Sequence, residues 1–412
     1  MKHFLKKGEN LVFSLLVFLL PAQLGYHFFS NFSYVFGIRV DYLAPTLYLT
    51  DILVFLLFIF WFLKEKKIET NYWLILFSGF AVVNILSASL PQAALFKWAK
   101  VGELLFLGYY VYDTKNLDIQ KSLILPLVYS VSFFSLVAIG QFVFQKTLGG
   151  PLYLLGERSF TAQTPGVALF AFFGKELLRP YSTFSHPNSL AGFMLVASFL
   201  LAFLNKNKKI IVRIALLLGA SAIFLSVSLN AYLSFLVVAI FYLIFRRKKI
   251  LTTKMVVSGL FLMLLASLAL PIFANIFMDR GVKAGESLFN RLVLAQASGK
   301  MLAESPLWGV GLNNFILQLP NSGVLPKISW WLQPVHNTNL LLLAETGLIG
   351  LILFAGLVIK SLAAATKHKN WAVLLSLLLI LVTGLSDHYW LTLQQNQLLF
   401  SLILGLSFRR DI

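Results

Sequence analysis

The chain has 412 residues, of which 58% are hydrophobic and only 12% are charged, and its mean hydropathy is +0.82. A soluble domain carries roughly 25% charged residues, so these values exclude a soluble protein and predict an all-α polytopic membrane protein. The formal net charge of +18 does not indicate a nucleic-acid partner, because most Lys and Arg residues lie in short loops between apolar runs. The absence of cysteine excludes disulfides and cysteine-ligated zinc.

A transmembrane helix needs roughly 20 apolar residues, and on this basis the sequence predicts about twelve spans. The first run follows a basic stretch and resembles a signal peptide, but the many later spans favour a retained first helix. The fourth span contains Lys97, Lys100 and Glu103, which are costly inside a bilayer. The predicted spans are 10–29, 43–63, 72–90, 95–112, 122–144, 188–204, 210–228, 230–245, 255–275, 338–358, 371–388 and 393–408.

The basic loops fall in alternate gaps between these spans, as in KEKKIE, NKNKKIIVR and RRKKILTTK. By the positive-inside rule that side is the cytoplasm. Both termini are therefore predicted to be cytoplasmic, in a multi-pass protein of the cytoplasmic (inner) membrane.

Two long segments, 145–187 and 276–337, are then predicted on the outer face. Their apolar and aromatic residues predict packed structure, including a short helix over RLVLAQASGKMLAE that ends at ESPLWGVG. The rest of the chain offers no boundary, so residues 1–412 are expected to form a single integral membrane domain.

Six polar residues fall on the predicted outer face or at helix mouths there. The sixth span starts at HPNS and the tenth at HNTN, so both present helix N-termini, which favour anions. Two guanidiniums and two imidazoles join them, and the arginine fork matches phosphate oxygens. The set therefore predicts a site for a phosphate or diphosphate, built from Arg179, His186, Asn188, Arg291, His336 and Asn337.

Each residue also has a simpler structural explanation. An Arg beside a span is most often an interface anchor, and His186 or Asn188 could be a helix cap. Glu345, nine residues after His336, is expected to lie deep on the opposite face of its helix and to pair within the bundle. Gly347 and Gly350 are expected to permit close helix packing.

At these residues the chain resembles the O-antigen ligase and O-antigen polymerase family of membrane glycosyltransferases. RPYSTFSHPNSLAGF is similar to the family's Arg-containing stretch that ends in Pro-Asn before a span. NRLVLAQASGKMLAESPLWGVGLNNF resembles its external helix, and HNTNLLLLAETGLIG resembles its His-Asn opening followed by Glu-x-Gly. The resemblance is specific over residues 179–358 and looser elsewhere.

The resemblance implies a helical bundle of the membrane glycosyltransferase type, without a cofactor. It implies a lipid-diphosphate donor, of the undecaprenyl-diphosphate type, whose glycan passes to a glycan, lipid or protein acceptor on the outer face. By position, Arg291 would hold the diphosphate, His336 would lie at the reaction centre and Arg179 would add positive charge. Leu229 stands where the family often has an Arg, so either Arg179 replaces that contact or the donor is held differently.

The outer segments show scattered acidic residues and no acidic metal cluster, which favours a metal-independent reaction. His336 could act as general base or could stay protonated and bind phosphate; the sequence leaves both open.

The acceptor is also open, so an O-antigen or polysaccharide polymerase and a protein O-oligosaccharyltransferase are alternatives to a ligase. A lipid-glycan flippase or secondary transporter is the alternative of another class, because twelve membrane spans are also common in transporters. A membrane scaffold is a third alternative, but it would not explain the cationic residues gathered at the outer ends of the predicted helices.

Overall fold

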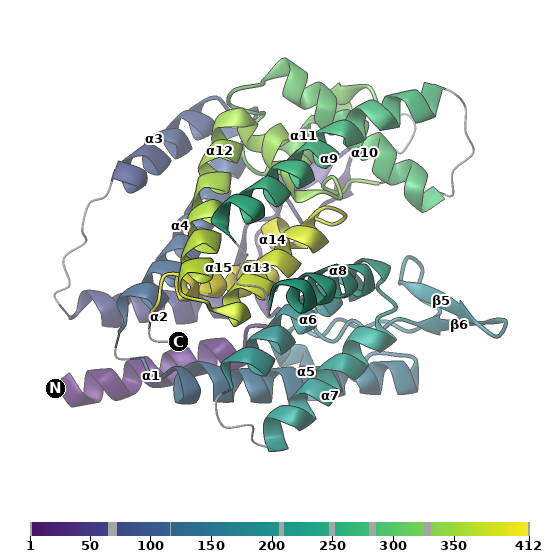
Figure 1. Ribbon diagram of the computed structural model, residues 1–412. Coiled ribbons are helices and arrows are strands. Elements are labelled where there is room, and N and C mark those ends of the chain that lie inside the picture. The colour runs from purple at the N-terminus through teal and green to yellow at the C-terminus, as the bar shows by residue number, and fades with distance from the viewer. Residues whose placement is uncertain are drawn as a thin grey trace.

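The computed structural model describes residues 2–64, 72–115, 117–205, 210–246, 252–279, 286–324 and 331–410. It is a bundle of helices (Figure 1) with three short two-stranded antiparallel sheets in its described residues. The helices are α1 (Lys2–Phe18), α2 (Leu49–Phe62), α3 (Tyr72–Leu86), α4 (Pro91–Asp113), α5 (Leu125–Phe144), α6 (Pro187–Leu204), α7 (Ile210–Leu225), α8 (Leu229–Phe245), α9 (Thr253–Asp279), α10 (Glu286–Glu304), α11 (Phe315–Gln318), α12 (Thr338–Lys367), α13 (Trp371–Gly384), α14 (Tyr389–Thr392) and α15 (Gln394–Ser407).

Short helical turns and strands fill the connections. The turns are η1 (Asn31–Ser33), η2 (Ile119–Ile124), η3 (Gly150–Leu155) and η4 (Pro320–Ser322). Antiparallel pairing joins β1 (Gly25–His27) to β4 (Thr46–Tyr48), β2 (Tyr34–Val35) to β3 (Ile38–Arg39), and β5 (Leu169–Phe172) to β6 (Lys175–Leu178).

A helix lies at each of the twelve predicted span positions. Within the described residues, four helices are long and apolar enough to cross a membrane: Ile119–Phe144, Pro187–Leu204, Val257–Ala274 and Thr338–Lys367. Several of the others are apolar helices of 10–17 residues. The helical membrane architecture is thus confirmed, whereas the count of twelve spans stays a prediction.

The first two predicted spans differ from the structure at their facing ends. The helix predicted over 10–29 ends at Phe18, and the one predicted over 43–63 begins at Leu49. Between them β1 pairs with β4, so backbone groups that a helix would have satisfied internally are satisfied across a two-stranded ladder instead.

Helix α6 lies in the interior and packs on α5, α7, α8, α13 and α15. Thirteen of its 18 residues are buried, because it is apolar around its whole circumference rather than along one stripe. It begins at Pro187, as predicted, with His186 as its N-cap. Its N-terminus is therefore fixed among neighbouring helices.

The two long segments contain packed structure, as predicted. In the first, Glu157 is buried and its carboxylate accepts hydrogen bonds from the backbone N–H groups of Leu148 and Gly149 and from the Gln141 side chain. In the second, α10 covers the predicted helix and packs on α9 and α12. The side of the membrane on which both lie stays a prediction.

Helix α12 is broken at Gly347, whose φ of 63° is left-handed. The break leaves backbone groups unpaired inside the bundle, and the turn after α10 pairs with them. Val310 and Gly311 donate to the carbonyls of Ala344 and Glu345 at 2.9 and 3.0 Å, and Leu348 and Ile349 donate to residues 306 and 307. Irregular backbone at membrane depth is tolerated only where it is paired in this way.

This pairing needs glycine. A Cβ on Gly347 would lie 2.3 Å from the Leu307 backbone, and one on Gly309 would lie 2.4 Å from Glu345. Gly347 therefore permits close packing, as predicted, with a loop rather than with a whole helix. Glu345 is buried within the bundle, also as predicted, and its carboxylate accepts from the Phe315 backbone N–H at 3.2 Å.

Candidate functional site

A four-residue linker, Leu385–His388, joins α13 to α14 and is held by the starts of two other helices. Asn337 Nδ2 donates to the Leu385 carbonyl at 2.9 Å, and Arg291 Nη1 donates to the Ser386 carbonyl at 3.3 Å. Thr338 Oγ1 donates to the Gly384 carbonyl at 3.1 Å, immediately before the linker. The starts of α10 and α12 thereby meet the end of α13.

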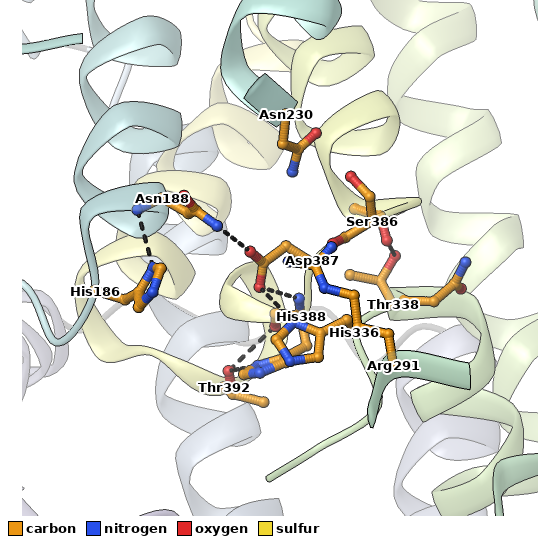
Figure 2. A network of polar contacts seen from close by, with 12 residues as sticks. His186, Asn188, Asn230, Arg291, His336, Thr338, Ser386, Asp387, His388 and Thr392 are labelled. Carbon is orange, nitrogen blue, oxygen red and sulfur yellow. Dashed lines mark hydrogen bonds and ion pairs between the residues drawn. The ribbon is translucent and has the colours of Figure 1, made fainter. Parts of the chain in front are cut away.

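Asp387 is the centre of this arrangement, and Figure 2 shows the polar side chains gathered around it. Its Oδ2 accepts from Asn188 Nδ2 at 3.3 Å, which brings in the start of α6. Its Oδ1 accepts from the His388 backbone N–H at 2.9 Å and lies 3.7 Å from His336 Nδ1. One buried carboxylate thus ties together residues that are nearly 200 positions apart in the sequence.

His336 lies next to Asp387 and His388 and is less buried than either of them. Among the described residues neither of its ring nitrogens has a hydrogen-bond partner, although both are buried. Its ring lies 5.1 Å from that of His388, which contacts Thr392 Oγ1 through Nδ1 at 2.8 Å (Figure 2). A buried polar group without a partner is expensive, so His336 is suited to a ligand that supplies the missing contact.

Arg179 reaches the same place from the end of β6. Its Nη2 donates to Asn188 Oδ1 at 2.6 Å and its Nε donates to the Ser226 carbonyl at 2.6 Å. Ser226 lies three residues before Leu229, which is exposed at the start of α8. The Arg179 guanidinium therefore lies between the α6 N-terminus and the turn that carries Leu229.

The charge states follow from burial and from one another. Burial raises the pKa of Asp387, but the contact with His336 and the nearby His388 and His186 outweigh it and lower that pKa well below its usual range. Burial lowers the pKa of His388 to about 3, and lowers that of His186 to about 4 despite attraction to Asp387. At neutral pH Asp387 is thus ionised while His186 and His388 are neutral.

Three side chains could in principle hold a cation. Ligand atoms of His336, Asp387 and His388 lie within 4.8 Å of one another. Both Asp387 oxygens already accept hydrogen bonds, however, and Arg291 is bound to the adjoining Ser386 carbonyl. A metal ion at these three side chains would therefore have to compete with existing contacts.

The structure brings all six predicted site residues to one place, through the contacts of Asn188, Arg291, His336 and Asn337 with residues 385–387. The capping explanation holds for His186, whose Nδ1 accepts from the Asn188 backbone N–H, but not for Asn188, whose side chain contacts Arg179 and Asp387. Asn337 likewise caps α12, because its Oδ1 accepts from the Leu340 backbone N–H. Capping fixes these side chains at the site, so the two explanations do not compete.

Sequence reasoning missed Asp387 and His388. The signal was available: SDH interrupts an apolar run at the predicted outer end of the eleventh span, and an acidic residue in such a place is rare and often functional. The span was predicted to continue to residue 388, whereas α13 ends at Gly384. The prediction therefore treated Asp387 and His388 as the last turn of a helix.

Comparison with known proteins confirms the resemblance found in the sequence. Residues 214–355 match the family model described as O-antigen ligase. A protein of Rickettsia bellii (strain RML369-C) named "Putative polysaccharide ligase" is 25% identical over 299 residues, which cover 70% of this chain and 66% of that protein. The family match includes Arg291, His336 and Asn337, whereas Arg179, His186 and Asn188 precede it.

Proposed function

From the O-antigen ligase match and the geometry of the site, we propose that this membrane protein is a glycosyltransferase of the ligase type. It transfers a glycan from a lipid-diphosphate donor, of the undecaprenyl-diphosphate type, to an acceptor at the outer face of the cytoplasmic membrane. The observation that carries the proposal is that Arg291 and His336 meet at adjacent residues, Ser386 and Asp387.

In the proposed reaction an acceptor hydroxyl oxygen bonds to C1 of the first donor sugar. The bond from C1 to the phosphate oxygen breaks, and its electron pair leaves with the lipid diphosphate. His336 takes the hydroxyl proton, and the carboxylate of Asp387 stabilises the imidazolium that forms. The products are the glycosylated acceptor and the free lipid diphosphate.

The developing negative charge needs preorganised positive charge, and this site supplies it without a metal. Arg291 and Arg179 carry guanidiniums, and the N-termini of α6 and α12 add partial positive charge. Asn188 and Asn337 hold these helix starts in place through Asp387 and Leu385. The arrangement favours His336 as the base over a phosphate ligand, because its Nδ1 already faces the Asp387 carboxylate.

Charged residues inside a span are also what a transporter would need, but two of the three in the fourth span, Lys100 and Glu103, are paired in the structure. Lys100 forms ion pairs with Asp51 and with Glu103, and Gln394 donates to Asp51. These charges offset one another between α2, α4 and α15. They support packing of the bundle and do not favour a transport path.

The direct test uses purified full-length protein in lipid nanodiscs, a lipid-diphosphate-linked glycan and an oligosaccharide acceptor. The wild type should release lipid diphosphate, whereas His336→Ala and Arg291→Ala should lower the rate by roughly 100- to 10,000-fold. Arg213→Ala, at an exposed position on α7, is the control and should retain the rate. Equal rates in all four proteins would refute the assignment.

The acceptor class requires a second experiment in cells. Loss of glycan attachment with long lipid-linked chains left over in a deletion strain indicates a ligase, whereas loss of chain length indicates a polymerase. Loss of glycan from protein alone indicates a protein O-oligosaccharyltransferase.

A further inference from the structure

A third arginine, Arg158, lies beside the site and has no part in the proposed reaction. Its Nη2 donates to the carbonyls of Phe184 and Ser185, at 3.2 and 2.7 Å, directly before His186. Its guanidinium carbon lies 5.2 Å from the centre of the Tyr181 ring, and Tyr181 in turn packs edge-on against His186 at 6.3 Å. The Arg158 side chain is thus fixed beside the N-terminus of α6.

Arg158 keeps free hydrogen-bonding capacity. The side chain is exposed, and within the described part of the chain only Nη2 makes hydrogen bonds. A guanidinium has five N–H donors, so Nε and Nη1 remain available to a ligand. The turn that carries it is held firmly, because Gln23 donates to the Leu155 carbonyl and a Cβ on Gly156 would lie 2.3 Å from Gln23.

Tyr42 belongs to the N-terminal segment between β3 and β4, and its side chain lies next to the site. Its ring packs edge-on against His388 with centroids 5.6 Å apart, and it also packs against both of the large hydrophobic clusters. The charges of Asp387 and Arg158 both act on its hydroxyl, whose pKa is raised chiefly by burial. Among the described residues this hydroxyl has no hydrogen-bond partner, so it can donate to a ligand and accept from one.

We propose that Tyr42 and Arg158 form the acceptor subsite, and that the acceptor is a carbohydrate with an anionic substituent, a phosphate or a carboxylate, close to the hydroxyl that reacts. This inference rests on the proposed glycan transfer. The Arg158 fork binds the anionic group, and the Tyr42 hydroxyl binds a neighbouring sugar hydroxyl.

The position of Tyr42 argues for the acceptor rather than for the donor. The base must face the acceptor hydroxyl, and Tyr42 reaches the base through His388, whose ring lies 5.1 Å from that of His336. Arg179 meets Asn188 instead, so Arg179, Arg291 and the helix N-termini already supply positive charge for the donor diphosphate. Tyr42 and Arg158 are therefore not needed to bind the donor diphosphate, which leaves them available for the acceptor.

The test measures initial rates against acceptor and against donor concentration separately. The probe acceptor is an oligosaccharide with a phosphomonoester, together with its phosphatase-treated form. Arg158→Gln should raise the acceptor KM about tenfold, the change expected from the loss of roughly one charge-assisted contact, and should leave the donor KM within about twofold. Phosphatase treatment should raise the wild-type acceptor KM similarly and add little in Arg158→Gln.

Two matched variants separate binding from folding. Tyr42→Phe keeps the ring on His388 and should raise only the acceptor KM, while Arg158→Lys keeps the charge and should fall between wild type and Arg158→Gln. An increase in donor KM, or unchanged KM values in Arg158→Gln, would overturn the subsite while leaving glycan transfer intact. If the wild type transfers nothing, the proposed function fails, and direct binding of the two probe oligosaccharides to wild type and Arg158→Gln still decides the subsite.

Discussion

His336 Nδ1 lies 3.7 Å from Asp387 Oδ1, and the other oxygen of the same carboxylate is held by Asn188. The histidine is therefore oriented by a buried negative charge that α6 keeps in place. A base whose imidazolium is stabilised in this way takes up a proton more easily when the acceptor hydroxyl reacts.

Replacing Asp387 by Asn tests this orientation. Asp387→Asn removes the charge with little change in volume, so we expect kcat to fall roughly 10- to 1,000-fold while the donor KM changes little. Because Asp387 is expected to act through His336, the double variant with His336→Ala should be no slower than His336→Ala alone. Fully additive losses would show that Asp387 acts independently of the histidine.

The position of Arg179 predicts a rescue. Arg179→Leu should abolish transfer, because the positive charge between Asn188 and Ser226 is lost. Leu229 follows Ser226 by three residues, at the start of α8. Leu229→Arg in the Arg179→Leu background should therefore restore part of the rate. The measurement is lipid-diphosphate release, with abundance in the membrane as the control, and no rescue would mean that the two positions are not equivalent.

Stability should fall on acidification, and the sign follows from the lowered histidine pKa values. His388 has a pKa of about 3 in the folded protein, against about 6.5 when unfolded, so between these values only the unfolded chain binds the proton. The stabilisation is complete above pH 6.5 and is lost as pH falls toward 3, with a slope of at most about 1.4 kcal/mol per pH unit. His186 adds a similar effect down to about pH 4.

Thermal unfolding in detergent between pH 7 and pH 5 measures this slope. His388→Gln removes one titrating group and should make the unfolding temperature less dependent on pH, whereas the control Arg213→Ala, at an exposed position on α7, should keep the wild-type dependence. An unchanged slope in His388→Gln would contradict the assigned charge state.

The break in α12 predicts a large difference between two glycines of one helix. Gly347→Ala places a Cβ 2.3 Å from the Leu307 backbone at a left-handed φ, so it should destabilise the fold by about 2–4 kcal/mol. Gly356→Ala meets only ordinary contacts, the nearest at 3.5 Å from Trp73, and should be neutral or slightly stabilising. Size-exclusion profiles and unfolding temperatures of the two variants provide the comparison.

The proposed metal independence makes a further prediction. If guanidiniums supply the positive charge, removal of divalent ions with EDTA should leave the transfer rate unchanged. Added Zn²⁺ should inhibit, since His336, Asp387 and His388 offer ligand atoms within 4.8 Å of one another and binding there would occupy the base. A rate that is lost with EDTA and regained with a divalent ion would refute the metal-independent reaction.

The helical architecture and the grouping of the six polar residues could be predicted because both depend on local signals. Apolar runs located the helices, and the pairs HPN and HNTN located two helix starts whose caps point to one place. The pairing of residues 306–311 with 344–349 could not be predicted, because it depends on how two glycine-containing segments meet in space. Asp387 was missed for a different reason: SDH interrupts the apolar run, but the predicted span was extended through it to residue 388, whereas α13 ends at Gly384.

Asn84 on α3 has its hydrogen-bond partners far ahead in the chain. Its side-chain amide donates to the carbonyls of Trp308 and Glu345, and its oxygen accepts from the Leu312 backbone N–H and the Trp98 indole. During synthesis, α3 therefore emerges more than 200 residues before most of the groups that satisfy this amide. The Asn84 amide can therefore be fully hydrogen-bonded only late in biogenesis, after the turn that follows α10 and the broken helix α12 have been synthesised and have packed against α3.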